Sequence, residues 1–200
     1  MTSPVYTIGH SNHSKEYFLE LLQCYNISCV VDVRSIAASR YNPQYNGKSL
    51  KEYLNQHHLE YIHLPDAFGA RQTNPLILDE NRQVDFEKMR QWAPFKKGIK
   101  ILLEMYNQNH NLALMCAEAD PLSCHRFFMV SVALVELGFQ VKHILKDKTY
   151  APHRELEEEL LKKYRKKIQP DMFNPEPGRK DALKYIYHLK NKEMGYIHNK

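Results

Sequence analysis

The sequence contains few cysteines and no long apolar run, and both shortages limit the kind of protein that it encodes. Four cysteines in 200 residues, with no C-x-x-C pair among them, are too few to stabilise a chain of this length through disulfide bonds. No apolar stretch approaches the roughly 20 residues of a membrane-spanning helix, and the first residues lack the basic and apolar blocks of a signal peptide. These absences favour a soluble, cytoplasmic protein with reduced thiols and no membrane partner.

Glycine is also scarce, with seven residues, whereas hydrophobic residues make up 43% of the chain and charged residues 26%. This composition excludes collagen-like and disordered chains and is typical of a globular protein with one substantial core. The formal net charge is +5, and residues 152–200 contribute +4 of it through twelve basic and eight acidic residues. We therefore predict an α/β core over residues 1–150 and a basic helical extension, packed on the core, over residues 151–200.

Apolar runs of strand length alternate with amphipathic stretches, the order that is typical of β-α-β units. Five runs are predicted to be strands: residues 4–10, 27–35, 59–65, 111–116 and 139–145. The pattern predicts an α/β fold, in which a single domain has a mainly parallel central sheet of about five strands flanked by helices, plus C-terminal helices. A longer helical segment over residues 85–109 is expected to break at Pro94 and Gly98.

The segment "DPLSCHRFFMVSVALVELG" predicts one helix with Asp120 as its N-cap, Pro121 at the first helical position and Gly138 at its end. Residues 66–84 are polar and irregular, so we expect a long loop there, of the kind that forms a lid. A proline-rich break over residues 170–177 is expected to separate the two C-terminal helices.

Ionisable residues follow four of the predicted strands, at the points where parallel strands deliver their carboxyl ends to one edge of the sheet. These residues are His10, Ser11 and Asn12, then Asp32 and Arg34, then His63 and Asp66, and finally Cys116 and Glu118, with Cys124, His125 and Arg126 in the helix that follows. The arginines near this edge, together with Arg40 and Arg71, outnumber the acidic residues. The excess of guanidinium groups favours an anionic ligand.

Several of these residues also have a purely structural interpretation. Cys124 shares a helix face with core residues, so it can serve in packing alone. Asp32 and Arg34 can form a structural ion pair, and Ser11 and Asn12 can cap the first helix. Two further cysteines, Cys24 and Cys29, are interpreted as packing residues, and the basic and aromatic loop "YNPQYNGK" is compatible with either phosphate binding or simple exposure.

Five motifs together resemble a known protein family. They are "TIGHSN", "VVDVRS", "SRYNPQYN", "YIHLP" and "LMCAEADPLSCHR" followed by "ELGFQVKHIL", and they are similar to the family named domain of unknown function 488 over nearly the whole chain. The resemblance implies a single α/β domain with these motifs gathered in one site, and it implies no particular reaction. Some members carry labels such as DNA-binding protein or iron metalloprotein. The sequence departs from the family pattern at Ala37 and at "FGAR".

A weaker similarity is to rhodanese-like domains, which place Asp-Val-Arg at one strand end and a cysteine at another. There the cysteine is followed by a short loop of backbone N–H groups that an arginine closes. Here Cys116 and Arg126 are ten positions apart, with Pro121 and no glycine between them, so an anion cradle would need a different construction.

Three functions are compatible with these residues. The first is an enzyme acting on a phosphorylated or nucleic-acid substrate, with catalytic candidates Glu118, His125, Cys116, Cys124 and Asp32, and substrate-binding candidates His10, Ser11, Asn12, Arg34, Arg40 and Arg126. The second is a binding module for a small anion or nucleic acid that uses the basic C-terminal segment. The third is a metal-binding protein.

The metal hypothesis would use Cys116, Cys124, and His125 or His10, with Glu118 as a ligand or base. Neighbouring residues on a helix point about 100° apart, so Cys124 and His125 are poorly placed to share an ion, and we assign no metal ligand. No cofactor and no oligomeric state follow from the sequence. We predict one cavity bordered by side chains that can hold a phosphate or sulfate ion: His10, Asp32, Arg34, Glu118 and Arg126.

Overall fold

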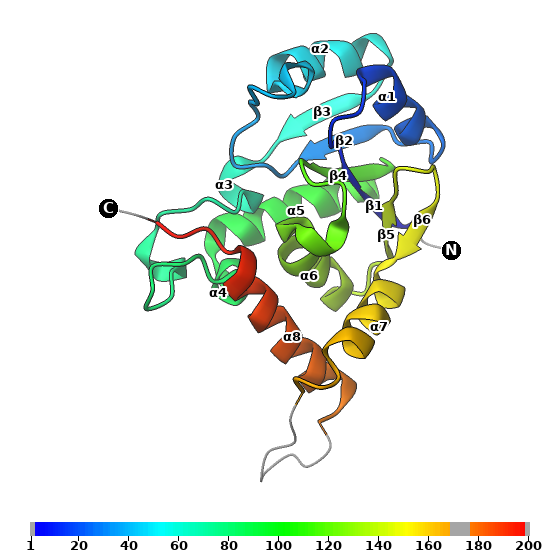
Figure 1. The fold of residues 1–200 in the computed structure, drawn as a ribbon. Coiled ribbons are helices and arrows are strands. Elements are labelled where there is room, and N and C mark those ends of the chain that lie inside the picture. Colours follow the sequence, from blue (N-terminus) through cyan, green and yellow to red (C-terminus); the bar gives the residue numbers. More distant parts are fainter. Residues whose placement is uncertain (1–2, 169–176, 199–200) are drawn as a thin grey trace.

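The computed structural model describes residues 3–168 and 177–198, and within them it confirms the predicted α/β fold (Figure 1). Six strands form one sheet in the order β3-β2-β4-β1-β5-β6. The strands are β1 (Val5–Gly9), β2 (Cys29–Asp32), β3 (Glu60–His63), β4 (Leu112–Cys116), β5 (Val141–Ile144) and β6 (Tyr150–Pro152). The first five are parallel, and β6 adds an antiparallel edge strand that the sequence pattern had not predicted.

Helices cover both faces of the sheet (Figure 1). Helices α1 (Lys15–Gln23) and α2 (Gly47–Gln56) pack on one face. The other face carries α3 (Pro65–Phe68), α4 (Phe86–Gln91), α5 (Ala93–Asn107), α6 (Val132–Glu136), α7 (His153–Tyr164) and α8 (Arg179–Met194). Central strand β4 is buried on both sides, as its unbroken apolar sequence predicts for a parallel sheet covered by helices.

The segment after β4 differs from the single helix that was predicted. Asp120 caps only a short 3₁₀ turn, Pro121–Ser123, by accepting the N–H of Leu122. The chain is then extended at Cys124, where φ is −136° and ψ is 139°, and a π-helical turn over Arg126–Ser131 leads into α6. Gly138 ends the helix with a φ of +88°, as predicted.

The predicted break in the helical segment over residues 85–109 is only partly correct. The break lies at Trp92, between α4 and α5, and Pro94 occupies the first turn of α5. Gly98 does not interrupt α5. A side chain there would collide with Ala67 and Phe68 of α3, so this glycine permits close packing of the two helices.

Helices α7 and α8 contribute to the same hydrophobic cluster as the face of the sheet that they cover. Leu156, Leu160 and Tyr164 of α7 and Ile186 of α8 are buried in it. The predicted proline-rich break between the two helices lies largely outside the described residues. Among the helices that the structure describes, none has the length and apolar character needed to cross a membrane.

Candidate functional site

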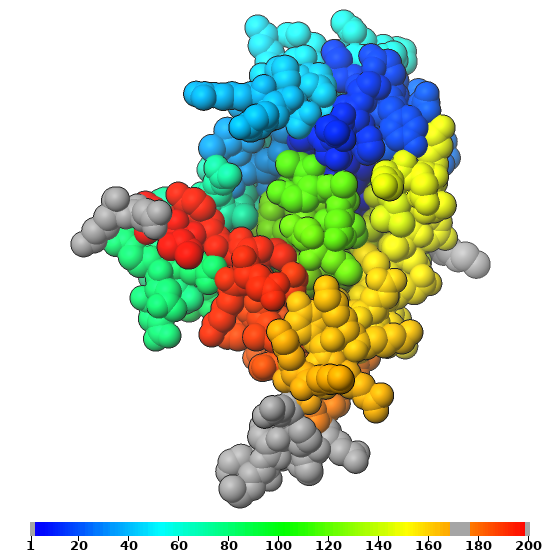
Figure 2. Space-filling view, in the orientation of Figure 1, coloured from blue at the N-terminus to red at the C-terminus, as the bar shows by residue number. Residues whose placement is uncertain are grey.

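The carboxyl ends of β1, β2 and β4 open into a cavity of about 760 Å³, which we call the strand-end cavity. This is the place where ligands bind in open α/β sheets. Its wall includes His10, Ser11, Asn12, Arg34, Arg71 and Glu118. The end of α8 completes the wall with Met194 and Tyr196, and Figure 2 shows this red end of the chain against the green surface formed by the segment before α4.

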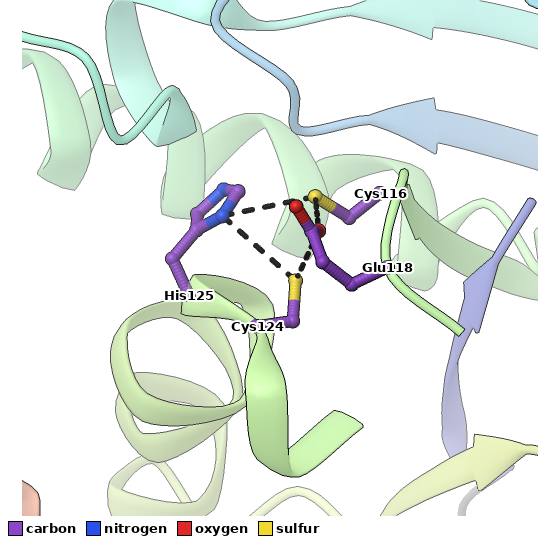
Figure 3. A group of neighbouring side chains, drawn as sticks. All are labelled: Cys116, Glu118, Cys124 and His125. Atoms are coloured by element: carbon purple, nitrogen blue, oxygen red, sulfur yellow. Dashed lines mark hydrogen bonds between the residues drawn. The ribbon is translucent and has the colours of Figure 1, made fainter. Parts of the chain in front are cut away.

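Four side chains that can bind a metal converge at the edge of this cavity (Figure 3). We call Cys116, Glu118, Cys124 and His125 the Cys–Glu–His cluster; one ligand atom from each lies within 4.8 Å of the other three. Sγ of Cys116 lies 3.0 Å from Oε2 of Glu118, and Sγ of Cys124 lies 3.1 Å from the same oxygen. Both cysteines are buried, whereas Glu118 is exposed at the cavity.

The extended backbone at Cys124 explains how two neighbouring residues reach one point. The objection that Cys124 and His125 point about 100° apart assumed that both are helical, and it is wrong because the helix begins only after Cys124. Cys124 lies immediately before the helical turn that His125 begins, and its Sγ accepts the N–H of Arg126 at 3.4 Å. An anionic sulfur is favoured there by the helix dipole.

His125 is oriented as a metal-binding imidazole. Its Nε2 donates to the carbonyl oxygen of Val33 at 3.1 Å, so the lone pair of Nδ1 faces the cluster. Nδ1 lies 3.7 Å from Sγ of Cys116 and 3.8 Å from Sγ of Cys124. Tetrahedral zinc with ordinary bond lengths requires a sulfur–nitrogen separation of about 3.6 Å. The imidazole nitrogen therefore lies close to the required distance from each of the two sulfurs.

The cluster concentrates acidic groups in a small volume. Although burial opposes the thiolate, a hydrogen bond from Cys116 and the charges of Arg126 and His125 hold the pKa of Cys124 well below its ordinary value. Burial and the hydrogen bond with Cys124 raise the pKa of Cys116 well above it. Desolvation of the Glu118 carboxyl group, which packs against the two sulfurs, and the Cys124 charge raise the pKa of Glu118. Although burial opposes charging, Cys124 raises the pKa of His125. Bound protons thus reduce the repulsion among the two thiols and the carboxylate, and a divalent cation can replace these protons.

Arg126 does not border the cavity, and this part of the prediction is wrong. The side chain is fully buried behind residues 116–126, the strand-to-helix corner that carries the cluster. Its Nη1 donates to the carbonyl oxygen of Glu118 at 2.6 Å and its Nη2 to that of Ala119 at 3.0 Å. The guanidinium is therefore occupied with backbone carbonyls rather than facing a ligand.

Asp32 is likewise buried beneath the cavity instead of lining it. It forms a bidentate ion pair with Arg34, whose Nη2 lies 2.6 Å from Oδ2, and it accepts the hydroxyl of Tyr61 at 2.7 Å. Arg34 also donates to the carbonyl oxygen of Tyr45 and lies 3.1 Å from Nε2 of His10. The Arg34 charge is therefore largely compensated.

His10 lines the cavity as a neutral ring. Burial, opposed by the hydrogen bond with the carbonyl of Ser11 and assisted by the nearby Arg34 charge, lowers its pKa to about 4. The ring stacks on Tyr45 with centroids 4.1 Å apart. Tyr45 itself is buried, so it cannot be the exposed aromatic residue that the basic loop suggested.

The remaining candidates divide between the cavity and the surface. Ser11 and Asn12 line the cavity, and they do not cap α1, because Ser14 accepts the N–H of Tyr17 and serves as the N-cap. Arg40 is exposed and lies outside the cavity wall. Arg71, in the predicted lid loop, is exposed on the wall, and no carboxylate among the described residues pairs with it.

Sequence reasoning missed Gly9, which makes the corner possible. A Cβ at this position would lie 1.9 Å from the carbonyl oxygen of Glu118. A glycine inside a strand is a signal of close backbone approach, and it was available in the sequence. Thr7 and His143 were also missed; both are polar residues buried within strands, where their burial becomes visible only in the structure.

The fold and the site define an α/β protein with a Cys–Glu–His cluster beside a cavity at the strand ends. The chain belongs to the family described as domain of unknown function DUF488, whose model matches residues 14–133. The matched segment contains the whole cluster, whereas β1, β5, β6, α7 and α8 lie outside it. Comparisons with curated proteins and with solved structures gave no match.

Proposed function

We propose that this protein is a metal-dependent enzyme that acts on a small anionic substrate, a phosphorylated molecule, in the strand-end cavity. The observation that carries this proposal is the convergence of two thiols, one oriented imidazole nitrogen and one carboxylate within 4.8 Å at the edge of that cavity. Thiolate and imidazole together suit Zn²⁺ or Fe²⁺ and are poor ligands for Mg²⁺ or Ca²⁺.

The unequal exposure of the four groups supports a catalytic rather than a purely structural ion. Cys116, Cys124 and His125 form a set of three ligands of the kind found in catalytic zinc sites, which keep a fourth position for water or substrate. Glu118 is the exposed member and lies on the cavity wall. It can serve as the fourth ligand or leave that position and accept a proton from the reacting water.

The ion, when bound, would lower the pKa of a water molecule and polarise an oxygen of the substrate. The chain's own groups would orient that substrate. Arg71 has no carboxylate partner among the described residues and would bind the anion, and the side chains of Ser11 and Asn12 would donate hydrogen bonds. Neutral His10 would add one polar contact without a second positive charge.

A thiol nucleophile is the second candidate, because the pKa of Cys124 is held well below its ordinary value and the imidazole of His125 lies beside it. The geometry favours it less. Cys124, the thiol with the lowered pKa, is not on the cavity wall, while the thiol that lines the cavity is Cys116, whose pKa is raised. A nucleophile needs the opposite arrangement, with the thiolate facing the substrate.

Metal analysis of protein purified without a histidine tag tests the proposal. We expect about one equivalent of zinc or iron, and Co²⁺ added to stripped protein should give thiolate-to-cobalt absorption. Cys116→Ser and Cys124→Ser should lose the metal, whereas Cys24→Ser, which changes an exposed cysteine away from the cluster, should retain it.

Glu118→Gln separates the two roles of the carboxylate. This variant should keep the metal and lose turnover in a panel of phosphoester substrates. Wild-type protein without stoichiometric metal and without Co²⁺ absorption would reject the metal site. In that case, rapid alkylation at Cys124 by iodoacetamide would favour the thiol nucleophile.

A further inference from the structure

A line of buried polar side chains leads from the back of the Cys–Glu–His cluster to α7. It begins at Arg126, whose Nε donates to Oγ1 of Thr7 at 3.3 Å. The Thr7 hydroxyl is 2.7 Å from Nδ1 of His143, and Nε2 of His143 is 3.1 Å from Nδ1 of His153. These four residues are at most 2% exposed. We call Thr7, His143, His153 and Glu157, the residue at which the line ends, the buried polar chain.

Glu157 ties the end of this chain to α8. Its Oε1 lies 3.4 Å from Nε2 of His153, which is ion-pair distance but not hydrogen-bond geometry. The same oxygen accepts the hydroxyl of Tyr187 at 2.6 Å, and Oε2 pairs with Arg179. One carboxylate therefore joins the last histidine to two residues of α8.

Hydrogen-bond donation along the buried polar chain runs in one direction, away from Arg126. A guanidinium can only donate, and an ionised carboxylate can only accept. Thr7 accepts from Arg126, and among the described residues its own proton has His143 as its acceptor. Both histidines then carry their proton on Nε2. Burial, with the neighbouring His153 and Arg126, lowers the pKa of His143 well below its ordinary value, which keeps this ring neutral.

Packing holds the two histidines in place. The ring of Phe127 stacks on His153 with centroids 4.1 Å apart and lies 5.1 Å from the ring of His143. Phe127 directly follows Arg126, so the same turn that carries the guanidinium also clamps the chain behind it. Buried polar groups held in this way are costly to leave unpaired, and each link therefore constrains the next.

Arg126 connects the buried polar chain to the segments that carry Glu118 and Cys124. Its guanidinium holds the carbonyls of Glu118 and Ala119, and its backbone N–H contacts Sγ of Cys124. We infer that the buried polar chain positions the metal ligands through Arg126, so that α7 and α8 take part in forming the site. This inference rests on the proposed function, because the property being positioned is metal affinity.

The buried polar chain extends beyond the segment that the family model matches. The cluster lies in the matched segment, residues 14–133, whereas His143, His153 and Glu157 lie beyond it. A site carried by the matched segment would thus depend on C-terminal elements that the match does not include. Groups that support metal ligands from behind typically change metal affinity by about 10- to 100-fold when they are removed.

Two pairs of variants in the full chain test the inference. Thr7→Val removes the hydroxyl and keeps the shape, and it should weaken Co²⁺ binding by about 10-fold in competition with a chelator. Thr7→Ser restores the hydroxyl and should restore the affinity. Glu157→Gln should weaken binding by at least about 3-fold. Glu158→Gln, which also removes a partner of Arg179 but does not contact His153, should leave the affinity unchanged.

A merely structural chain would lower the unfolding temperature of Thr7→Val and leave Co²⁺ affinity as in the wild type, and this result would overturn the inference while the proposed function stands. If Thr7→Val does not fold, the Glu157 and Glu158 pair decides the question in the same way. If the wild type binds no Co²⁺, the proposed function fails, and amide chemical shifts of residues 118–126 decide the inference. Shifts that change in Glu157→Gln and not in Glu158→Gln support it; equal spectra overturn it.

Discussion

Replacing Gly9 with alanine would displace the corner that carries the proposed metal ligands. The new Cβ would lie 1.9 Å from the carbonyl oxygen of Glu118 and 2.9 Å from Cα of Ala119, and real Cβ contacts stay beyond 3.0 Å. Gly9 pairs with Cys116 inside the parallel sheet, so β1 cannot easily move away and the corner after β4 must be displaced instead. The displacement needed is about 1.1 Å, whereas metal sites tolerate ligand shifts of about 0.2 Å.

We therefore expect Gly9→Ala to weaken Co²⁺ binding by about 100-fold or more. The overpacking should also lower the free energy of unfolding by about 1–3 kcal/mol. Co²⁺ affinity, measured by absorption against a competing chelator, and urea unfolding of the same samples would give both quantities. Gly9 has no positive φ, so the effect would come from the collision and not from backbone strain.

Gly98→Ala is the matched control for this experiment. Its Cβ would lie 2.5 Å from Cβ of Ala67 and 2.8 Å from the ring of Phe68, so it should also destabilise the fold. It lies in α5, which contributes no residue to the cluster, and its Co²⁺ affinity should equal that of the wild type. A folded Gly9→Ala protein with wild-type affinity, or equal losses in both variants, would refute the reasoning.

Three further predictions concern the cavity and the surface. The folded-state pKa of His10, about 4, is lower than its ordinary value of 6.5, so the unfolded chain binds the proton more tightly. Stability should therefore fall by about 3 kcal/mol as the pH drops from 6.5 to 4, and His10→Gln should reduce this loss in urea unfolding curves. Arg71→Ala should weaken binding of inorganic phosphate by about 10-fold in calorimetry, whereas Arg40→Ala, outside the cavity wall, should not; equal effects would argue against the cavity as the anion site. If the basic extension binds nucleic acid, single-stranded DNA should be retarded at low salt only, and neutralising the exposed Lys162, Lys163 and Lys166 should reduce the retardation; no change would exclude the end of α7 and the turn after it as the contact surface.

Local sequence patterns determined the fold class and the edge of the sheet at which the site lies. The unbroken apolar run of β4 predicts a strand buried on both faces, and such strands require a parallel sheet covered by helices. Because parallel strands place their carboxyl ends at one edge, His10, Cys116 and Glu118 could be expected to meet there. The edge strand β6 escaped this reasoning because three residues carry too little periodicity to be recognised.

The tertiary structure alone decided what each group at that edge does. The sequence suggested that Cys124 is helical, which argued against a metal ion shared with His125. In the structure Cys124 is extended, and this removes the objection. A change of φ and ψ at one residue redirects its side chain and leaves no clear signal in the sequence. Arg126 and Asp32 were expected at the cavity wall, yet both are buried beneath it, since burial depends on packing from distant segments. The contact of Arg126 with Thr7, and through it with His143 and Glu157, joins residues far apart along the chain, and only folding brings such residues into hydrogen-bond distance.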